Sequence, residues 1–371
     1  MINKVTAEDI FKVMEDWAPT HYAYDWDNVG LQIGSYTKPV SKIMITLDVL
    51  DSVVDEAIAN DVDLIIAHHP LLFKPLKELN LQSPQGRVIQ KLIKHDITVY
   101  ASHTNLDVTN GGVNDMLCDA LQIHSRDILV DEKTEALYKI VFYVPESHED
   151  TFRETIGNSG AGHIGNYSHC TFQSSGQGTF KPLEGTNPYI GSTNELEKVN
   201  ELRMETIVKQ TDLARVIDEL ITKHPYEEPA YDIYLLANKG DAYGLGRIGI
   251  LQDPMTPQAF ADHVKNSLNV PWVRMTRGHK DNIKTVAVLG GSGEGYFKAA
   301  LNKGADAYIT GDVTFHIAQD ADELGLSIVD PGHHVEKVMK QGVKDYLMNH
   351  LSMDRIEIIT STVDTEPFSI Q

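Results

Sequence analysis

Short apolar runs alternate with helix-patterned segments over residues 41–121 of this chain. Three runs and three helical segments follow one another in the order 43–47, 53–59, 64–67, 88–94, 97–101 and 113–121. Strands that read as continuous apolar runs are typical of parallel sheets covered by helices on both faces. The first third of the chain is therefore predicted to be α/β.

The segment before this alternation carries a helix-start signal. Thr6 is followed three residues later by Asp9, which is the spacing of a capping box. Ile10, Met14 and Trp17 then recur near helical spacing. We expect a first helix that begins directly after Thr6.

The pattern changes after residue 128 and returns after residue 240. The intervening strand-like and helix-like segments follow the order β-α-β-β-α-β, at 138–144, 149–156, 160–178, 202–208, 213–222 and 231–236. This order is typical of a ferredoxin-like α+β domain of about 110 residues. We therefore predict an inserted domain at 129–239, between the halves 1–128 and 240–371 of an outer α/β domain with a mostly parallel sheet.

Composition excludes several classes of protein. With 53 Asp and Glu against 32 Lys and Arg, the net charge of −21 repels phosphate backbones and anionic membranes, so nucleic acid is not an expected partner. The two cysteines, Cys118 and Cys170, form no paired motif, which argues against a disulfide scaffold and a thiolate metal site. No apolar run approaches the roughly 18 residues of a membrane span, and no signal peptide is recognisable. We expect a cytoplasmic protein.

Two histidines, His68 and His69, follow the second apolar run and precede Pro70. Ligands gather at the carboxyl ends of parallel strands, so this position suits a site. Neighbouring strand residues point to opposite faces, so the two imidazoles either serve two ions or one of them turns into the loop. The structural alternative is a pair of turn histidines bonded to the backbone.

Two more strand ends carry metal-ligating residue types. The third apolar run leads into His103 and Asp107, and a late strand at 327–329 leads into His333 and Glu336, three apart at the start of a helix. Nitrogen and oxygen donors without sulfur suit zinc, iron or manganese, and the set is larger than one tetrahedral ion needs. Two ions bridged by a carboxylate account for it. For Asp107 alone, a turn or helix cap remains the alternative.

Three weaker segments leave structural and functional interpretations open. The glycine-rich segment 289–295 either presents backbone N–H groups to an anion or forms a tight turn, and it lacks the dinucleotide spacing and the P-loop lysine. Asp312, after the strand 307–310, either caps a helix or lies at the same sheet edge as the candidate ligands. There it would support one of the ligands or act as a general base. Segment 25–30 either lines a pocket or is a loop held by Trp26.

Several of these motifs together resemble the signature of the Nif-three-like dinuclear-metal family, whose bacterial members are also called GTP cyclohydrolase 1 type 2 homologs. The resemblance covers nearly the whole chain and rests on Ala67–Pro70, Thr104–Asp107, Thr310–Asp312, Gly332–Glu336, Trp26–Leu31 and Gly244–Gly249. The inserted segment, through Gly165–Ser168 and Pro225–Pro229, is similar to the CutA-like, PII-like module of the longer members.

The resemblance implies a ligand set and an assembly. Two divalent ions per chain, zinc first and iron or manganese as alternatives, would be held by His68, His69, Asp107, His333 and Glu336. The choice of His333 over His334 stays open, because short members space this histidine and glutamate four apart. His103 is not assigned as a ligand. We expect it next to the ligands, where it could orient one of them or exchange protons. The family also implies a homo-oligomer in the form of a toroidal hexamer.

Two functions from different classes fit these expectations. The first is a metal-dependent hydrolase acting on a nucleotide or a similar small molecule, with Arg247 and Lys74 as the basic residues available for phosphate. The second is a non-enzymatic regulatory or assembly protein whose PII-like insertion senses a ligand or partner. An open coordination position would favour chemistry over a structural metal. No catalytic residue is assigned from the sequence.

Overall fold

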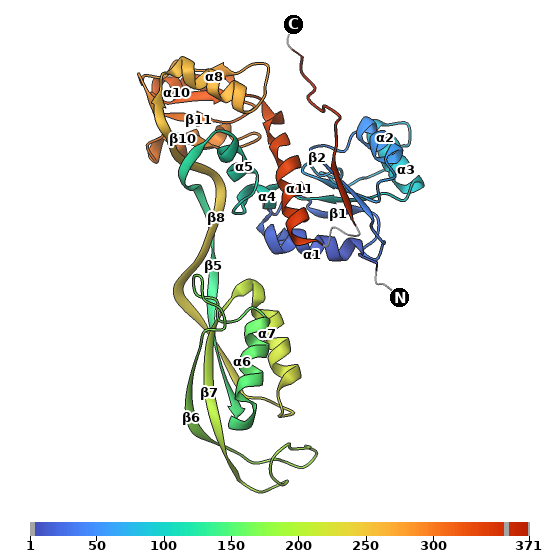
Figure 1. The fold of residues 1–371 in the computed structure, drawn as a ribbon, viewed down its shortest axis with the longest axis vertical. Coiled ribbons are helices and arrows are strands. Elements are labelled where there is room, and N and C mark those ends of the chain that lie inside the picture. The colour runs from blue at the N-terminus through green and yellow to red at the C-terminus, as the bar shows by residue number, and fades with distance from the viewer. Residues whose placement is uncertain (1–3, 352–355, 370–371) are drawn as a thin grey trace. The chain divides into compact units, whose positions relative to one another are not determined.

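The computed structural model describes residues 4–351 and 356–369 of the chain. It divides into two compact units, which we call the split unit, Met1–Glu132 with Tyr243–Gln371, and the inserted unit, Lys133–Ala242. Figure 1 shows the inserted unit in green and yellow, between the two halves of the split unit in sequence.

The first sheet of the split unit contains the apolar runs of the N-terminal third. Its strand order is β1(Gly30–Ile33), β4(Thr98–Ala101), β3(Leu64–Ala67), β2(Lys42–Thr46) and β13(Glu357–Thr360). The pairs β4–β3, β3–β2 and β2–β13 are parallel, and only β1 runs antiparallel to its neighbour. The α/β prediction for this third is confirmed, with α2(Asp51–Ala59) and α3(Pro84–Lys94) as the connecting helices.

The second sheet of the split unit belongs to the C-terminal half. Its order is the C-terminal part of β8(Tyr231–Met255), then β10(Ile283–Val288), β11(Ala307–Ile309), β12(Ser327–Asp330) and β9(Arg274–Met275). β10, β11 and β12 are parallel, with antiparallel neighbours at both sides. The prediction of one mostly parallel sheet was therefore wrong. Each apolar run shows that a strand is buried, but not which other strand it pairs with.

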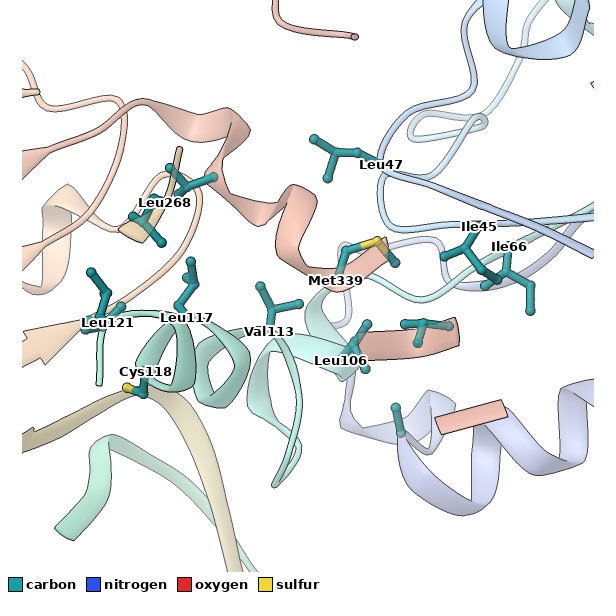
Figure 2. Close-up of a cluster of buried hydrophobic side chains, with 14 of the residues drawn as sticks. Ile45, Leu47, Ile66, Leu106, Val113, Leu117, Cys118, Leu121, Leu268 and Met339 are labelled. Atoms are coloured by element: carbon teal, nitrogen blue, oxygen red, sulfur yellow. The ribbon is translucent and has the colours of Figure 1, made fainter. Parts of the chain in front are cut away.

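One hydrophobic cluster joins the two sheets. It includes Ile45 and Ile66 of the first sheet, Val288 of the second, Leu117 of α5(Val113–Ala120) and Met339 of α11(Met339–His350). Figure 2 shows part of this cluster, with side chains from both halves of the chain. Because the same core packs against both sheets, the strand ends of one half are held beside those of the other.

The first helix, α1(Ala7–Trp17), begins as the sequence predicts. Thr6 caps it, its hydroxyl accepting from the backbone N–H of Asp9, while the Thr6 backbone N–H donates to the Asp9 carboxylate at 2.8 Å. The capping box is confirmed. The hydrogen bonds from Thr6 hold the pKa of Asp9 below its usual range.

Several helices have no counterpart in the predicted pattern. They connect strands of the split unit or precede them, and they are η1(Thr20–Tyr22), α4(Thr104–Val108), α8(Pro257–Ser267), η3(Glu294–Tyr296) and α10(Phe315–Glu323). The 3-10 helix η4(His333–Val338) begins where the sequence predicts the start of a helix. The short helix α9(Phe297–Asn302) follows η3. Among the described residues, no helix has both the length and the apolar character needed to cross a membrane.

The inserted unit has the predicted order β-α-β-β-α-β. Its elements are the C-terminal part of β5(Ile123–Pro145), then α6(Glu149–Asn158), β6(Thr171–Phe180), β7(Glu197–Lys209), α7(Gln210–Lys223) and the N-terminal part of β8, with a short η2(Glu146–His148) after β5. The strand order is β6-β7-β5-β8, with antiparallel β6–β7 and β5–β7 pairs. A separate core that includes Phe142, Phe152 and Leu220 packs the two helices on this sheet.

Candidate metal centre

His68 and His69 lie directly beyond the end of β3. Because the strand stops at Ala67, the two imidazoles do not alternate across the sheet, and their ring centroids are 5.2 Å apart. The Nδ1 atom of His68 is 2.9 Å from the carbonyl oxygen of Ser102, and His69 Nδ1 is 2.7 Å from Asp48 Oδ1. Both histidines therefore turn toward the same side, because they lie in the turn beyond the strand and not within it.

Asp107 comes from α4, which is separated from the end of β4 by two residues. Its Oδ1 atom is 3.6 Å from His68 Nε2. His103 precedes α4 as its N-cap residue, and its ring centroid is 5.2 Å from that of His68. The sequence analysis predicted that His103 supports a ligand and is not itself one. The structure places its ring beside the rings of both His68 and His69.

His333 and Glu336 come from η4, the 3-10 turn after β12. In a 3-10 helix residues i and i+3 eclipse each other, so the three-residue spacing brings the two side chains together. His333 Nε2 is 3.1 Å from Glu336 Oε2, and the same oxygen is 3.1 Å from His69 Nε2. His334 instead lies 3.2 Å from the hydroxyl of Thr365. The structure thus places His333, and not His334, beside Glu336.

Together these residues form what we call the histidine–carboxylate cluster: His68, His69, His103, Asp107, His333 and Glu336. Within it, three groups have ligand atoms that all lie within 4.8 Å of one another: His68, Asp107 and Glu336; His69, His333 and Glu336; and His68, His69 and His103. All five ligands expected from the sequence are brought together. Glu336, His68 and His69 each belong to two groups, and of these three only Glu336 has two oxygen atoms with which to bridge two ions.

In every histidine of the cluster, the Nδ1 atom lies within hydrogen-bond distance of an acceptor oxygen. The acceptors are Ser102 O for His68, Asp48 for His69, Asp27 for His103 and Asp312 for His333, at 2.9, 2.7, 2.9 and 2.7 Å. An acceptor at Nδ1 fixes the tautomer and leaves Nε2 as the donor atom toward a metal. This pattern is typical of metal-binding histidines.

These supporting carboxylates were only partly predictable. Asp27 and Asp312 lie in segments that the sequence singled out, and both now have a definite partner. Asp48 was missed, although it stands just beyond the carboxyl end of β2, the same kind of position that identified His68. Applying the strand-end rule to the first apolar run would have found it.

Two buried atoms of the cluster lack a partner. His68 Nε2 and Asp107 Oδ1 are inaccessible to solvent and make no hydrogen bond within the described part of the chain. Their separation of 3.6 Å, and the 3.8 Å from His68 Nε2 to Glu336 Oε1, are too long for hydrogen bonds. Leaving such groups unpaired costs about 1–3 kcal/mol each. A cation between them would satisfy both, so the residues fit a metal ion.

The metal-free site pairs carboxylates with protonated histidines. Burial opposes the charge on His69, but Asp48 and Glu336 outweigh it and raise the pKa of His69 to about 10. The hydrogen bond to Glu336 raises the pKa of His333 to about 9, against burial. Burial also opposes ionisation of Glu336, yet His333, His68 and His69 hold its pKa well below the usual range. Burial raises the pKa of Asp107 to about 6.

The glycine-rich segment 289–295 makes room for this cluster. A Cβ atom on Gly291 would lie 2.4 Å from Glu336 Oε1 and 3.4 Å from His333 Nε2, and Gly291 has a φ of +63°. The short contact that a Cβ would make and the positive φ both require glycine at this position. The segment is thus a tight turn whose smallness admits Glu336, which decides between the two interpretations left open by the sequence.

Arg247 does not serve the site as expected. Its guanidinium is buried and donates to Asp115 at 3.0 Å, to the carbonyl oxygens of Gly244 and Gly246 at 2.9 and 2.8 Å, and to that of Thr109 at 3.0 Å. With these donors engaged, Arg247 cannot also bind phosphate. Its role is structural, whereas Lys74 is exposed.

Two exposed aromatic side chains border the cluster. Trp26 is 59% exposed and Phe73 is 45% exposed, and their ring centroids are 5.8 Å apart. Each also lies near the ring of His103, at 6.3 and 6.4 Å. Large aromatic rings at the surface beside a polar cluster provide stacking faces for a planar ligand.

Comparison with known proteins places the chain in a family. The sequence model of Duf34/NIF3 (NGG1p interacting factor 3) matches residues 5–367. The chain belongs to this family. The resemblance seen in the sequence motifs is thereby confirmed.

Relatives match the chain over its full length. A "GTP cyclohydrolase 1 type 2 homolog" of Halalkalibacterium halodurans is 50% identical over 364 residues, 98% of each chain. One of Bacillus subtilis is 48% identical over 371 residues, 100% of each chain. The crystal structure of a Bacillus cereus protein related to NIF3 has a TM-score of 0.90 and 47% identity, covering 100% of both chains. The family's fold therefore extends over both units.

Proposed function

We propose that the histidine–carboxylate cluster binds two divalent metal ions and that the protein is a metal-dependent hydrolase acting on a nucleotide or a similar small molecule. The observation that carries this proposal is the pair of buried, unpartnered atoms His68 Nε2 and Asp107 Oδ1. Buried polar atoms are nearly always paired, so the exceptions require an explanation. A bound cation supplies it.

The ligand assignment follows from the three groups. One ion would take His68, Asp107 and Glu336, and the other would take His69, His333 and Glu336, with Glu336 between them. Nitrogen and oxygen donors favour zinc, with iron and manganese as alternatives. Each ion then has three protein ligands, which leaves a position for solvent or substrate, as catalytic sites require.

The protein's own groups prepare the site for hydrolysis. Bound ions of this kind lower the pKa of a water molecule and polarise the bond under attack. Asp48 and Asp312 hold the Nδ1 protons of His69 and His333, so both imidazoles keep their orientation. His103, held at Nδ1 by Asp27, keeps its Nε2 atom available to accept or return a proton.

Two observations support a nucleotide-like substrate. The exposed rings of Trp26 and Phe73 offer stacking faces next to His103, and base–aromatic stacking is worth about 1–3 kcal/mol. The relatives carry the name GTP cyclohydrolase 1 type 2 homolog. With Arg247 engaged elsewhere, the ions themselves are the main phosphate-binding charge in this proposal.

The assembly and the nature of the inserted unit are proposed on the family resemblance. We propose a toroidal hexamer, as the family implies, and a CutA-like, PII-like character for the inserted unit, which its β-α-β-β-α-β order supports. Size-exclusion chromatography with light scattering tests the subunit number. A monomer would contradict the hexamer without touching the metal site.

The decisive experiment is the metal content of the protein purified without added metal. Elemental mass spectrometry is expected to give about two ions per chain in the wild type. His69→Ala and Glu336→Ala should both lose metal, Glu336→Ala more completely because the proposal assigns Glu336 to both ions and His69 to only one. His334→Ala is the matched control, since this neighbouring histidine faces Thr365 and should leave the content unchanged.

Nucleotide hydrolysis is then measured with the loaded wild type and the same variants. Hydrolysis that disappears with the metal in Glu336→Ala and persists in His334→Ala supports the enzyme. Metal content unaffected by either ligand substitution contradicts the site. Two bound ions without turnover of any nucleotide contradict the hydrolase, and leave the regulatory protein as the better account.

A further inference from the structure

A pocket lies wholly within the inserted unit. It has a volume of about 510 Å³ and is formed by the end of β6, the loop that follows it, β7 and the segment after α7. Pockets that hold small molecules measure about 300–1,000 Å³. Neither the histidine–carboxylate cluster nor the proposed hydrolysis uses this pocket.

The most unusual residue of the pocket is Glu201 of β7. Only 7% of it is exposed, although it carries a carboxylate that lines the pocket. In the described part of the chain, no lysine, arginine or histidine nitrogen lies within 4.0 Å of its carboxylate oxygens. A buried carboxylate is costly unless a cation or a hydrogen-bond donor compensates its charge.

The strand next to Glu201 is shaped around this carboxylate. Gly178 of β6 lies beside it, and a Cβ atom at Gly178 would be only 1.9 Å from Glu201 Oε2. Any other residue at this position would push the carboxylate away. The absence of a side chain at Gly178 thus lets Glu201 keep its place in the pocket.

Aromatic rings form part of the pocket walls. Tyr143, Phe180, Tyr189 and Tyr226 all line the pocket, and the ring of Tyr226 lies 5.8 Å from that of Phe180 and 6.3 Å from that of Tyr189. Tyr226 is held in position because its backbone N–H donates to His224 Nδ1 at 3.0 Å, while His224 Nε2 donates to the carbonyl oxygen of Tyr143 at 2.8 Å. The aromatic part of the pocket is therefore preorganised for a ligand.

The hydroxyl of Tyr226 is buried and interacts with the Glu201 carboxylate. Burial and the nearby Glu201 carboxylate raise the pKa of Tyr226, so the hydroxyl stays protonated. Glu201 and Tyr226 line the same pocket, so a ligand there would meet a carboxylate beside an aromatic ring.

The charge of the lining indicates which ligand suits it. Three carboxylates, those of Glu201, Glu227 and Glu228, line the pocket with a single cation, Lys181. An anionic ligand would meet this excess of negative charge. Aromatic faces around a carboxylate are the arrangement that recognises ammonium groups.

We propose that this pocket binds a small organic cation, whose ammonium group lies between the aromatic rings and the Glu201 carboxylate. A bare metal ion fits less well, because the groups able to hold a metal among the described residues all lie in the histidine–carboxylate cluster. Binding there would give the inserted unit a ligand of its own, independent of the metal site.

The test uses the full-length protein and three probes. Choline carries a quaternary ammonium group, 3,3-dimethylbutan-1-ol has the same shape without the charge, and putrescine offers primary amines. Saturation-transfer NMR with titration gives the affinity of each. Choline or putrescine is expected to bind at least about tenfold more tightly than the neutral alcohol. The preferred cation then identifies the type of ammonium group.

Three variants locate the binding. Glu201→Gln should weaken cation binding by about tenfold and leave binding of the neutral alcohol unchanged, since it removes charge but keeps shape. Tyr189→Leu, at an exposed ring whose loss should not unfold the unit, should also weaken it. Asp218→Asn removes one exposed carboxylate of α7 outside the pocket and is the matched control.

Each outcome decides the proposal. Charge-selective binding that is lost in Glu201→Gln and Tyr189→Leu but kept in Asp218→Asn supports it. Equal binding of choline and the neutral alcohol overturns it, as does cation binding that survives both pocket substitutions. Failure of both cations to bind the folded wild-type protein also overturns it.

Discussion

Two buried polar clusters of the split unit differ in whether their groups are paired. Around Arg247, the guanidinium donates to Asp115 and to three carbonyl oxygens, and the residue is only 3% exposed. In the histidine–carboxylate cluster, His68 Nε2 and Asp107 Oδ1 are equally inaccessible but have no partner in the described structure.

The difference separates a structural polar cluster from a functional one. A fully paired network has its hydrogen-bonding capacity used within the chain, so it holds the fold and binds nothing else. A network with unpaired ligand atoms sacrifices stability at the point where something from outside can bind. Burial alone does not distinguish them, since both clusters are deep in the same unit.

The largest expected effect is on the paired cluster. Arg247→Ala should lower the free energy of unfolding by about 3–5 kcal/mol, because it leaves Asp115 and the carbonyl oxygens buried without their donor. Urea denaturation measures the change. Arg277→Ala, at an exposed arginine, should shift stability by no more than about 0.5 kcal/mol. Equal effects of the two substitutions would remove the contrast between the clusters.

The second prediction concerns the glycine turn beside Glu336. Gly291→Ala should cost about 1–3 kcal/mol through its positive φ and should also displace Glu336, so that metal content falls. Gly295→Ala in the same segment is the matched control, because a Cβ there meets nothing within 4 Å. Retention of both ions by Gly291→Ala would show that Glu336 is not held by this turn.

The third prediction concerns the carboxylates behind the histidines. Asp48→Asn should weaken metal binding by about 10–100-fold, since it no longer fixes His69 as strongly. Asp312→Asn should have a smaller effect, because the Asp312 side chain is 49% exposed and that of Asp48 is 26% exposed. Competition with a chelator measures both affinities, with the exposed Asp320→Asn as control. The reverse order would contradict the assigned roles.

The smallest expected effect is the number of protons that metal binding releases. Because the pKa values of His69 and His333 are about 10 and about 9 in the metal-free protein, both are charged at pH 7.5. Metal uptake should then release about two protons per chain. Calorimetry in buffers of different ionisation enthalpy measures the release. Binding with no proton release at this pH would show that the histidines are already neutral.

The same pKa values set how stability depends on pH in the metal-free protein. Both values are raised above the usual 6.5 of an unfolded chain, so the stabilisation is fully present below pH 6.5. It is lost as the pH rises through about 9 and about 10. Urea denaturation with a chelator should show this loss, and the metal-loaded protein should not.

Local patterns in the sequence predicted the elements that end at the site. The strand at 64–67 and the capped first helix are observed as expected, because apolar periodicity and capping depend on residues close together in the chain. The ligand types at three strand ends followed from the same patterns together with the strand-end rule. The division of the split unit into two sheets did not, because strand pairing depends on distant partners.

The sequence by itself determined which residue types stand at the strand ends, and the family motifs among them. Only the tertiary structure decided how they are used: His333 instead of His334, His103 inside the cluster, Asp48 behind His69 and Arg247 in a structural network. Glu336 and His69 are separated by 267 positions, yet their side chains lie 3.1 Å apart. Such contacts depend on how the core brings two sheets together, and no local periodicity in the chain encodes that distance.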